Sequence, residues 1–580
     1  MALSISRGSA EYLRTGNKFR LGCLMTEKSH PITRHLSEVP IAEGLRLLNK
    51  VDYQIPPVFN RLASENKLDL PIDAVVNAIH RGNKIFVTGC GATGRLSIQM
   101  DAMWRRFWKG TEYADRIFSI MAGGDYALIK SVEGFEDKTD FGRRQICEMG
   151  LSAGDIVFAV TEGGETSHVI GTAWEGVRSG ADVFFIYNNP DAILIDNVER
   201  SREIIWGIRV TKINMTTGPQ SITGSTRMQA ASIETLILAS MLETASLRLS
   251  GKSSKDIRDL AEASYDIPAF VERAIPDLAK LVELESQTYL NGCNFNHFGD
   301  PYPDRGYANY IAGADSSLIV LTDTTERAPT FNTSPFRTRE ELERGAKISP
   351  VYMTLDAVNN ESAWTSMLQR PIRGLDWGYG IANDDILKFV ISGADVLKFR
   401  PIGAGNLTVG ICLGDEVDLL RDKNSFLYQT LIKAKRQGGR TALIAVTDKE
   451  IDFDNLPPLD VKVLLTDVPS SPFKVAQSLV LKMLLNTLST EVMVKMGRVK
   501  GNYMTYVTPT NMKLIDRATR YVSALSGVSY DVANDYIFSV MEDTEEDRKA
   551  GKGLPPTVLI ALKRIEAGVN TDEAIRLLIR

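Results

Sequence analysis

The sequence predicts an α/β protein in which two five-stranded parallel sheets, each flanked by helices, follow one another along the chain. Short β-branched and aromatic runs alternate with amphipathic stretches, which is typical of parallel sheets. Five such runs followed by a long apolar helix occur twice. The chain has 580 residues, enough for about four units of ordinary domain size. Each predicted sheet can therefore have a core of its own.

Helices are predicted before the first sheet and after the second. Between residues 37 and 80, apolar side chains recur at helical spacing, for example at Ile41, Leu45 and Leu48. From Asn511 onward, two more apolar stripes with this spacing predict a C-terminal helical cap.

The first sheet is predicted from five apolar runs, and a helix from about residue 226 to 249 closes this half. The runs are 85–87, 117–120, 156–160, 183–186 and 204–206.

The second sheet is predicted from runs before a helix at about 473–496. These runs are 318–321, 351–353, 407–411, 442–446 and 461–465. The stretch from about 356 to 400, which contains Trp364 and Trp377, interrupts the repeat and is interpreted as an insertion.

Composition argues against several functional classes. With 67 Lys and Arg against 72 Asp and Glu, the net charge of −5 gives no electrostatic reason to bind nucleic acid or an anionic membrane. Five scattered cysteines predict no disulfide framework and favour a cytoplasmic location. No signal peptide or membrane span is predicted. Five histidines without ligand spacing predict no dedicated metal site, which leaves a magnesium ion held by carboxylates open. No cofactor is expected.

A glycine-rich loop follows the first predicted strand. The residues from Gly89 to Gly94 have the pattern GxGxxG before a helix, where backbone N–H groups and the helix dipole favour an anion. A dinucleotide site would place an acidic residue about 20 residues further on, whereas Asp125 lies about thirty residues after Gly94. The spacing argues against NAD. A turn that needs glycine only for its geometry is the alternative.

Two more polar turns are expected at the same edge of the first sheet. The candidate phosphate ligands in the three turns are the hydroxyl groups of Thr93, Thr161, Thr166, Ser225 and Thr226. Open α/β sheets bind ligands at the carboxyl ends of their strands. Hydroxyl groups and helix N-terminal amides can hold a phosphate without much net positive charge. For each hydroxyl taken singly, N-capping of a helix is the alternative.

An acidic segment with Glu133 and Glu136 follows the second strand. At the rim of a phosphate pocket, a carboxylate can take a proton from a sugar carbon or hold a sugar hydroxyl. The alternative is a solvated helix start, and the sequence does not decide between them.

Together these residues resemble the sugar isomerase (SIS) domain superfamily, and more narrowly the branch of N-acetylmuramic acid 6-phosphate etherases and glucokinase regulatory proteins. The resemblance runs from about residue 37 to the C-terminus. It is carried by segments 89–96, 122–125, 133–137, 223–228 and 511–514, together with Asn502. In this branch, an etherase chain has one SIS domain and the protein is a homodimer. A regulatory-protein chain has two SIS domains and a helical cap.

The tandem layout implies four parts. They are a helical lead-in at 1–80, a first SIS domain with the phosphate loops at 81–255, a second SIS domain with the insertion at 266–500, and the cap at 501–580.

The resemblance also implies a catalytic glutamate. In the etherases, a proposed acid/base Glu lies in an Asp-x-x-Glu-x-x-Pro-Thr segment after the glycine loop. The first copy has Met103 at this position, whereas the second copy keeps the segment with Glu326. The second copy's own loop, at 313–317, lacks the glycine pattern, and its last turn, at 470–472, lacks the Ser-Thr-Arg pattern.

This complementary loss predicts one composite site. Its phosphate would lie on Thr93, Ser225, Thr226 and the 161–166 turn. Glu326 from the second copy and Glu136 from the first are the predicted catalytic groups, and Lys513 matches a family lysine that contacts the sugar phosphate. The alternative is that both sites have decayed and Glu326 only packs or caps a helix.

The implied ligand is a phosphorylated amino sugar, and three functions stay open. The first is cleavage of the lactyl ether of N-acetylmuramic acid 6-phosphate, which needs two acid/base groups. The second is a non-catalytic regulator that binds a sugar phosphate and controls a partner sugar kinase. The third is isomerisation of a sugar phosphate. The glutamates do not discriminate among these functions.

Overall fold

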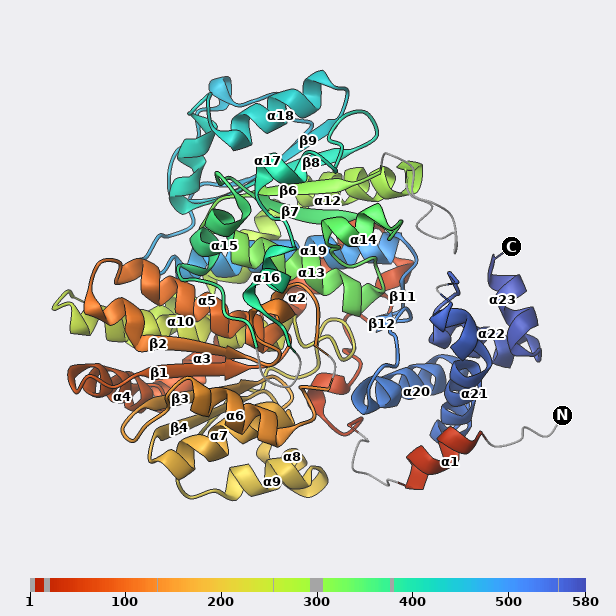
Figure 1. Cartoon of the computed structure of the whole chain (residues 1–580), viewed down its shortest axis with the longest axis horizontal. Helices are drawn as coiled ribbons and strands as arrows, with labels where there is room; N and C mark the ends of the chain where they lie inside the picture. The colour runs from red at the N-terminus through yellow and green to blue at the C-terminus, as the bar shows by residue number, and fades with distance from the viewer. Residues whose placement is uncertain are drawn as a thin grey trace.

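The computed structural model describes residues 6–14, 21–132, 134–253, 255–292, 306–375, 380–550 and 552–579. It contains two five-stranded parallel sheets, with strand orders β2-β1-β3-β4-β5 and β10-β9-β8-β6-β7 (Figure 1). In each sheet the order in which strands are added reverses after the second strand. The third strand lies on the other side of the first one, so β3 is next to β1 and β8 is next to β6. The predicted fold class is confirmed.

The first sheet has four of its five strands where the sequence predicted them. The strands are β1 (Ile85–Gly89), β2 (Ile117–Met121), β3 (Ile156–Thr161), β4 (Asp182–Tyr187) and β5 (Val210–Asn214). The helices are α5 (Ala92–Phe107), α6 (Thr139–Glu148), α7 (Ser167–Ser179), α8 (Asp191–Asn197), α9 (Glu199–Trp206) and α10 (Gln229–Leu249).

The predicted strand at 204–206 is wrong, because these residues end α9. Ile204 and Ile205 are buried while Trp206 is 63% exposed, which fits one face of an amphipathic helix. The true fifth strand, β5, begins at Val210.

The second sheet repeats the plan. Its strands are β6 (Ala308–Ala312), β7 (Val351–Leu355), β8 (Leu407–Leu413), β9 (Arg440–Val446) and β10 (Val461–Leu465). The main helices are α12 (Asp266–Gly292), α13 (Ser317–Phe331), α14 (Arg339–Glu343), α18 (Phe426–Arg436) and α19 (Val475–Lys495).

The predicted strand at 318–321 is also wrong, because it forms the start of α13. A short apolar run that is buried on all sides suits a helix as well as a strand. The true strand, β6, contains the polar residue Asn309, whose Oδ1 accepts a hydrogen bond from Arg400 Nε at 2.7 Å. As a result, Glu326 lies on the helix that follows the first strand of its copy, as Met103 does in α5.

The closing helices of the two copies, α10 and α19, pack against each other between the sheets, together with α5 and α13 (Figure 1). Helix α10 is long and apolar enough to cross a membrane by length and composition, but 94% of its most apolar window is buried inside the protein. A helix that is apolar all round is typical of a core position.

Helices also lie before the first sheet and after the second. The first group is α2 (Ile41–Asp52), α3 (Ile55–Ser64) and α4 (Asp69–His80). The second group is α20 (Met512–Ser526), α21 (Tyr530–Lys549), α22 (Thr557–Ala567) and α23 (Thr571–Ile579), reached through the short strands β11 (Val499–Lys500) and β12 (Tyr503–Met504). The N-terminal helix α1 (Arg7–Arg14) packs on α21 at the side of the molecule (Figure 1). The predicted helices are confirmed, and the domain limits stay a division made from the sequence.

The predicted insertion occupies the connection from β7 to β8 and contains α15 (Asn360–Leu368), α16 (Asn383–Leu387) and α17 (Gly393–Val396). It reaches across to the first copy. The buried Arg370 binds Asp125 with two hydrogen bonds of 2.7 and 2.8 Å, and Leu375 packs on Ala122 and Phe135. The insertion thus covers the first sheet beside its glycine loop. Trp377 lies outside the described residues.

Candidate functional site

The glycine loop joins β1 to α5 and has backbone amides without a protein partner among the described residues. Gly91 has a φ of +57°, which glycine adopts without strain. A Cβ at Gly89 would lie 2.4 Å from the Thr93 carbonyl group, so no side chain fits there. In the described part of the chain, the N–H groups of residues 92–94 have no protein acceptor. Free N–H groups at a helix N-terminus favour an anion.

The hydroxyl group of Thr93 closes this loop. It accepts a hydrogen bond from Cys90 N at 3.0 Å and donates one to Cys90 O at 2.7 Å. The second copy has the same closure, since Ser316 Oγ accepts from Gly313 N at 3.1 Å. Binding of phosphate by the Thr93 hydroxyl, as predicted, would require it to leave Cys90.

The turn after β3 contains both predicted hydroxyls, and the Thr161 hydroxyl donates to Thr166 Oγ1 at 3.1 Å. It also carries Glu165, which the sequence analysis did not single out. Glu165 forms ion pairs with Arg200 and with Lys513 Nζ, the latter at 3.1 Å. Burial disfavours its charge, but Lys513 and Arg200 outweigh burial and lower the pKa of Glu165 to about 2.

A second unpredicted acid in this turn, Glu162, lies directly after the last residue of β3. It is 9% exposed, and its Oε1 has no hydrogen-bond partner among the described residues. Burial raises the pKa of Glu162 to about 7 against the opposing effect of Lys513. Its position at the carboxyl end of a central strand was visible in the sequence and could have identified it.

The two hydroxyl groups before α10 are available to a ligand. Ser225 is buried and Thr226 is half-buried. Within the ranges that the structure describes, neither hydroxyl has a recorded protein partner. Unlike the hydroxyl groups of Thr93 and Thr161, those of Ser225 and Thr226 can therefore bind a phosphate without first breaking a hydrogen bond within the protein.

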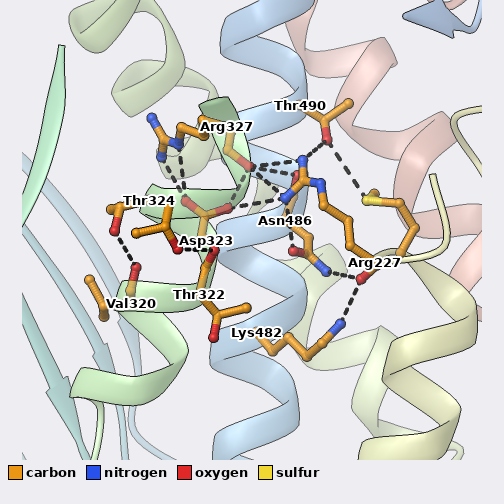
Figure 2. Close-up of polar contacts among 12 residues, drawn as sticks. Arg227, Val320, Thr322, Asp323, Thr324, Arg327, Lys482, Asn486 and Thr490 are labelled. Carbon is orange, nitrogen blue, oxygen red and sulfur yellow. Dashed lines mark hydrogen bonds and ion pairs between the residues drawn. The ribbon is translucent and has the colours of Figure 1, made fainter. Parts of the chain in front are cut away.

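Arg227, the next residue, fixes this turn to the second copy. Figure 2 shows its guanidinium pointing toward α13 and α19. It donates to Asp323 Oδ1 at 3.3 Å, to Asn486 Oδ1 at 3.2 Å and to Thr490 Oγ1 at 2.9 Å. Asp323 is itself held by Arg327 Nη2 at 2.8 Å. The Ser-Thr-Arg turn is therefore joined to the helix that carries Glu326.

Glu326 contacts the helix that follows the glycine loop. Its Oε1 accepts a hydrogen bond of 2.5 Å from Arg95 Nη1 in the first turn of α5. A cavity with a volume of about 20 Å³ lies beside it between α5, α10, α13 and α19, and Arg227 and Lys482 also line it. This space holds about one water molecule.

Lys513 and Glu136 approach from the other side. Lys513 Nζ lies 3.1 Å from Glu136 Oε1. Burial opposes its charge, but Glu136 and Glu165 outweigh burial and raise the pKa of Lys513 well above its usual value. The carbonyl of Glu136 accepts a hydrogen bond from His168 N at 3.1 Å, which ties this segment to α7. Glu133 lies outside the described residues.

Glu27, in the lead-in, positions the helix that carries Lys513. Its carboxylate binds Arg517 at 2.5 Å and Arg520 at 2.6 Å. Burial opposes this charge, but the two arginines lower the pKa of Glu27 to about 2. The Tyr521 hydroxyl donates to the carbonyl of Thr223, just before the Ser225 turn. Sequence reasoning missed these contacts, which join segments far apart in the chain.

The corresponding loop of the second copy is closed by a side chain. Glu416 Oε1 accepts hydrogen bonds from Asp315 N at 2.6 Å and Ser316 N at 3.2 Å, and its Oε2 accepts from Leu413 N at 2.9 Å. A Cβ at Gly313 would lie 2.2 Å from Glu416 Oε1. The protein's own carboxylate therefore lies where the first copy leaves free amides.

No metal centre is evident in the described ranges, where no three His, Cys, Asp or Glu side chains are arranged to hold an ion.

Comparison with known proteins places the chain in a family. Residues 67–173 match the family described as the glucokinase regulatory protein N-terminal SIS domain. An N-acetylmuramic acid 6-phosphate etherase from Mesorhizobium japonicum is 30% identical over 256 residues, which are 44% of this chain and 78% of that protein. The chain belongs to the etherase and regulatory-protein branch of the SIS superfamily.

Another etherase is similar over a comparable length, and solved structures are similar at lower identity. An N-acetylmuramic acid 6-phosphate etherase from Exiguobacterium sp. is 31% identical over 40% of this chain and 72% of that protein. Among solved structures, the tagatose-6-phosphate ketose/aldose isomerase from Escherichia coli has a TM-score of 0.43 and 11% identity, and covers 82% of this chain and 99% of that chain. The etherase matches thus concern less than half of this SIS-family chain.

Proposed function

We propose that this SIS-family chain binds a phosphorylated amino sugar in one composite site between its two copies. The phosphate lies at the N-terminus of α5, and Glu326 of the second copy faces the sugar. One observation carries the proposal: the two copies have equivalent loops, of which the second is filled by Glu416 and the first has free amides. A loop that binds a carboxylate in one copy has the geometry to bind an anion in the other.

The side chains around the first loop suit a phosphate. The hydroxyl groups of Ser225 and Thr226 can each donate a hydrogen bond to a phosphate oxygen. Lys513 supplies a positive charge, although Glu136 and Glu165 already share it. A phosphate group would compete with these two carboxylates for the ammonium group, so its binding depends on the amides and hydroxyls as well.

Ether cleavage is the chemistry that the paired carboxyl groups favour. In such an elimination, a base removes the proton at sugar C2, the bond from C3 to the ether oxygen breaks, and an acid protonates the departing oxygen. Glu326 and Glu136 come from different copies and flank the proposed phosphate position. In this structure each is paired with a cation, Arg95 or Lys513. Pairing with a cation suits a carboxylate that acts as a base, and the ligand must displace the cation from the group that acts as the acid.

A thermal-shift panel tests binding directly. N-acetylmuramic acid 6-phosphate, glucosamine 6-phosphate and fructose 6-phosphate are compared with their unphosphorylated sugars. A ligand at a hundredfold excess over its Kd stabilises the native state by about 2.7 kcal/mol. We expect a shift with at least one phosphosugar and none with its unphosphorylated form. No shift with any phosphosugar would overturn the proposal.

Lactate release then separates lyase from regulator. With N-acetylmuramic acid 6-phosphate, a lyase releases lactate, and Glu326→Gln keeps binding but loses about 10²–10⁴-fold in rate. The matched control is Glu343→Gln on the exposed surface of the second copy, which should leave the rate unchanged. Binding without lactate release would favour the regulatory alternative with a partner sugar kinase. Interconversion of aldose and ketose phosphates would favour an isomerase.

A further inference from the structure

Glu162 lies beside the proposed phosphate position with an unsatisfied carboxyl group. It follows β3 next to the glycine loop, where the strand order of the first sheet reverses between β1 and β3. Its Oε1 has no hydrogen-bond partner within the described ranges, and water does not replace one easily, because the residue is only 9% exposed. A buried carboxylate oxygen without a donor is unfavourable unless it is protonated or a ligand reaches it.

Charged groups from three other elements face Glu162. Lys513 on α20 attracts its negative charge, whereas Glu326 on α13 and Glu136 before α6 repel it. Lys513 is already shared between Glu136 and Glu165. A further anion would therefore compete with these two carboxylates for Lys513.

Three further titratable groups lie near Glu162, on α10, on α19 and in the glycine loop. Glu234 on α10 accepts a hydrogen bond from Asn188 Nδ2 at 2.9 Å, and burial together with the charge of Glu162 raises its pKa well above the usual value. Lys482 on α19 has its pKa lowered by burial to about 8, so it is mostly charged at pH 7, but its ammonium group donates to the Arg227 carbonyl at 2.9 Å and to Ser232 Oγ at 2.8 Å. Burial also raises the pKa of the Cys90 thiol. The Cys90 thiol therefore adds no charge near Glu162, and burial favours the neutral form of Glu234.

We propose that Glu162 takes up a proton when the phosphosugar binds, and that the resulting carboxylic acid donates a hydrogen bond from Oε1 to the ligand's phosphate. The proton comes from solvent, stays on Oε1 while the ligand is bound and returns to solvent on release, with no covalent change in the ligand. Protonation removes the repulsion between a carboxylate and a dianion, and it adds one donor to the free amides and the hydroxyl groups of the pocket. This inference rests on the proposed function, because it requires a phosphate at the glycine loop.

The pH dependence of binding follows from the free protein. Since the pKa of Glu162 is about 7 before binding, about half of the molecules at pH 7 must take up a proton, so binding takes up about half a proton per site. If the protonated form binds the ligand, the apparent Kd rises about tenfold from pH 6 to pH 8. The ionisation of the sugar phosphate itself adds a separate pH dependence, which a variant without the carboxyl group retains.

Calorimetry measures this proton uptake. N-acetylmuramic acid 6-phosphate is titrated at pH 7 into the full chain in two buffers with different ionisation enthalpies, and the difference in binding enthalpy gives the number of protons taken up. We expect uptake by the wild type to exceed that of Glu162→Gln by about half a proton. Glu343→Gln is the control, because Glu343 lies on the exposed surface of the second copy and its replacement should leave the uptake as in the wild type.

Two results would overturn this inference while leaving the proposed function intact. One is equal proton uptake by the wild type and Glu162→Gln, and the other is an equal loss of uptake in Glu162→Gln and Glu343→Gln. Absence of binding to the wild type, with this sugar and with inorganic phosphate, would defeat the proposed function itself. If Glu162→Gln does not fold, infrared difference spectra of the wild type decide. A new band of a protonated carboxyl group on ligand binding supports the inference, and its absence overturns it.

Discussion

Replacement of Glu416 by alanine should open an anion site in the second copy. The side chain accepts three backbone hydrogen bonds, from the N–H groups of Asp315, Ser316 and Leu413. A hydrogen bond to a charged group contributes about 1.5–3 kcal/mol, and an unsatisfied buried donor costs about 1–3 kcal/mol. Burial and repulsion from Asp315 raise the pKa of Glu416, which offsets part of that stabilisation. We therefore expect a net loss of about 3 kcal/mol.

Phosphate should restore part of this loss. For a unit of 150–250 residues, about 3 kcal/mol corresponds to a decrease in Tm of about 6–12 °C. If the opened loop binds phosphate with a Kd of about 1 mM, then about 10 mM phosphate returns about 1.4 kcal/mol. The assay is the Tm of Glu416→Ala with phosphate and with chloride at equal ionic strength.

The wild type and Glu416→Gln serve as controls. The wild type measures the general effect of phosphate and its binding to the first copy. Glu416→Gln keeps an acceptor in the loop, so it should lose less stability and gain no more from phosphate than the wild type. An equal phosphate effect in all three proteins would refute the view that Glu416 occupies an anion site.

Three further changes test the site and its supports. Thr226→Val should weaken phosphosugar binding about ten- to a hundredfold by calorimetry, because it removes a hydroxyl but keeps the side chain's shape. Arg370→Met should lower the free energy of unfolding by about 3–5 kcal/mol in urea titrations, because it leaves Asp125 buried without its cation. The pKa of Glu27 is lowered to about 2 from 4.5, so its stabilisation is present above pH 4.5 and is lost as pH falls toward 2. Between pH 5 and pH 2, the wild type should therefore lose about 3 kcal/mol more than Glu27→Gln.

Each of these three predictions has a control variant or an outcome that would contradict it. Unchanged affinity in Thr226→Val would remove this turn from the site, and Thr111→Val, beyond the end of α5, controls for general effects. Lys398→Met breaks an exposed ion pair in the same insertion and should cost under about 0.5 kcal/mol. A cost for Arg370→Met as small as this would show that the insertion is not anchored through Asp125. Parallel stability curves for the wild type and Glu27→Gln in acid would exclude Glu27 as the anchor of α20.

Most of the fold follows from local sequence, because eight of the ten predicted strands are apolar runs that the sheets bury. The two errors have a common cause. Runs 204–206 and 318–321 are apolar but helical, and the strand that replaces the second of them, β6, contains Asn309. Its side chain is satisfied by Arg400 and the carbonyl of Pro401. A polar residue in a buried strand is acceptable only when such a partner exists, and local sequence does not show the partner.

The site was predictable where its residues lie at strand ends or match a family segment. The glycine loop, the Ser225 turn and Glu326 were identified in this way, and contacts of Arg95 with Glu326 and of Arg227 with Asp323 join the segments that carry them. Arg95 follows the glycine loop, but local sequence does not indicate its role, because its pairing with Glu326 depends on how the two copies pack. Glu27 and Glu416 were missed because each acts on backbone or side chains of a distant segment.

The number of phosphosugar molecules bound per chain tests the central claim most directly. Calorimetric titration of the full-length wild type with N-acetylmuramic acid 6-phosphate measures this number. One free loop and one loop closed by Glu416 predict a single site per chain. Two sites would show that Glu416 does not exclude a ligand from the second copy, and no binding of this sugar or of any other phosphosugar in the panel would contradict the composite site itself.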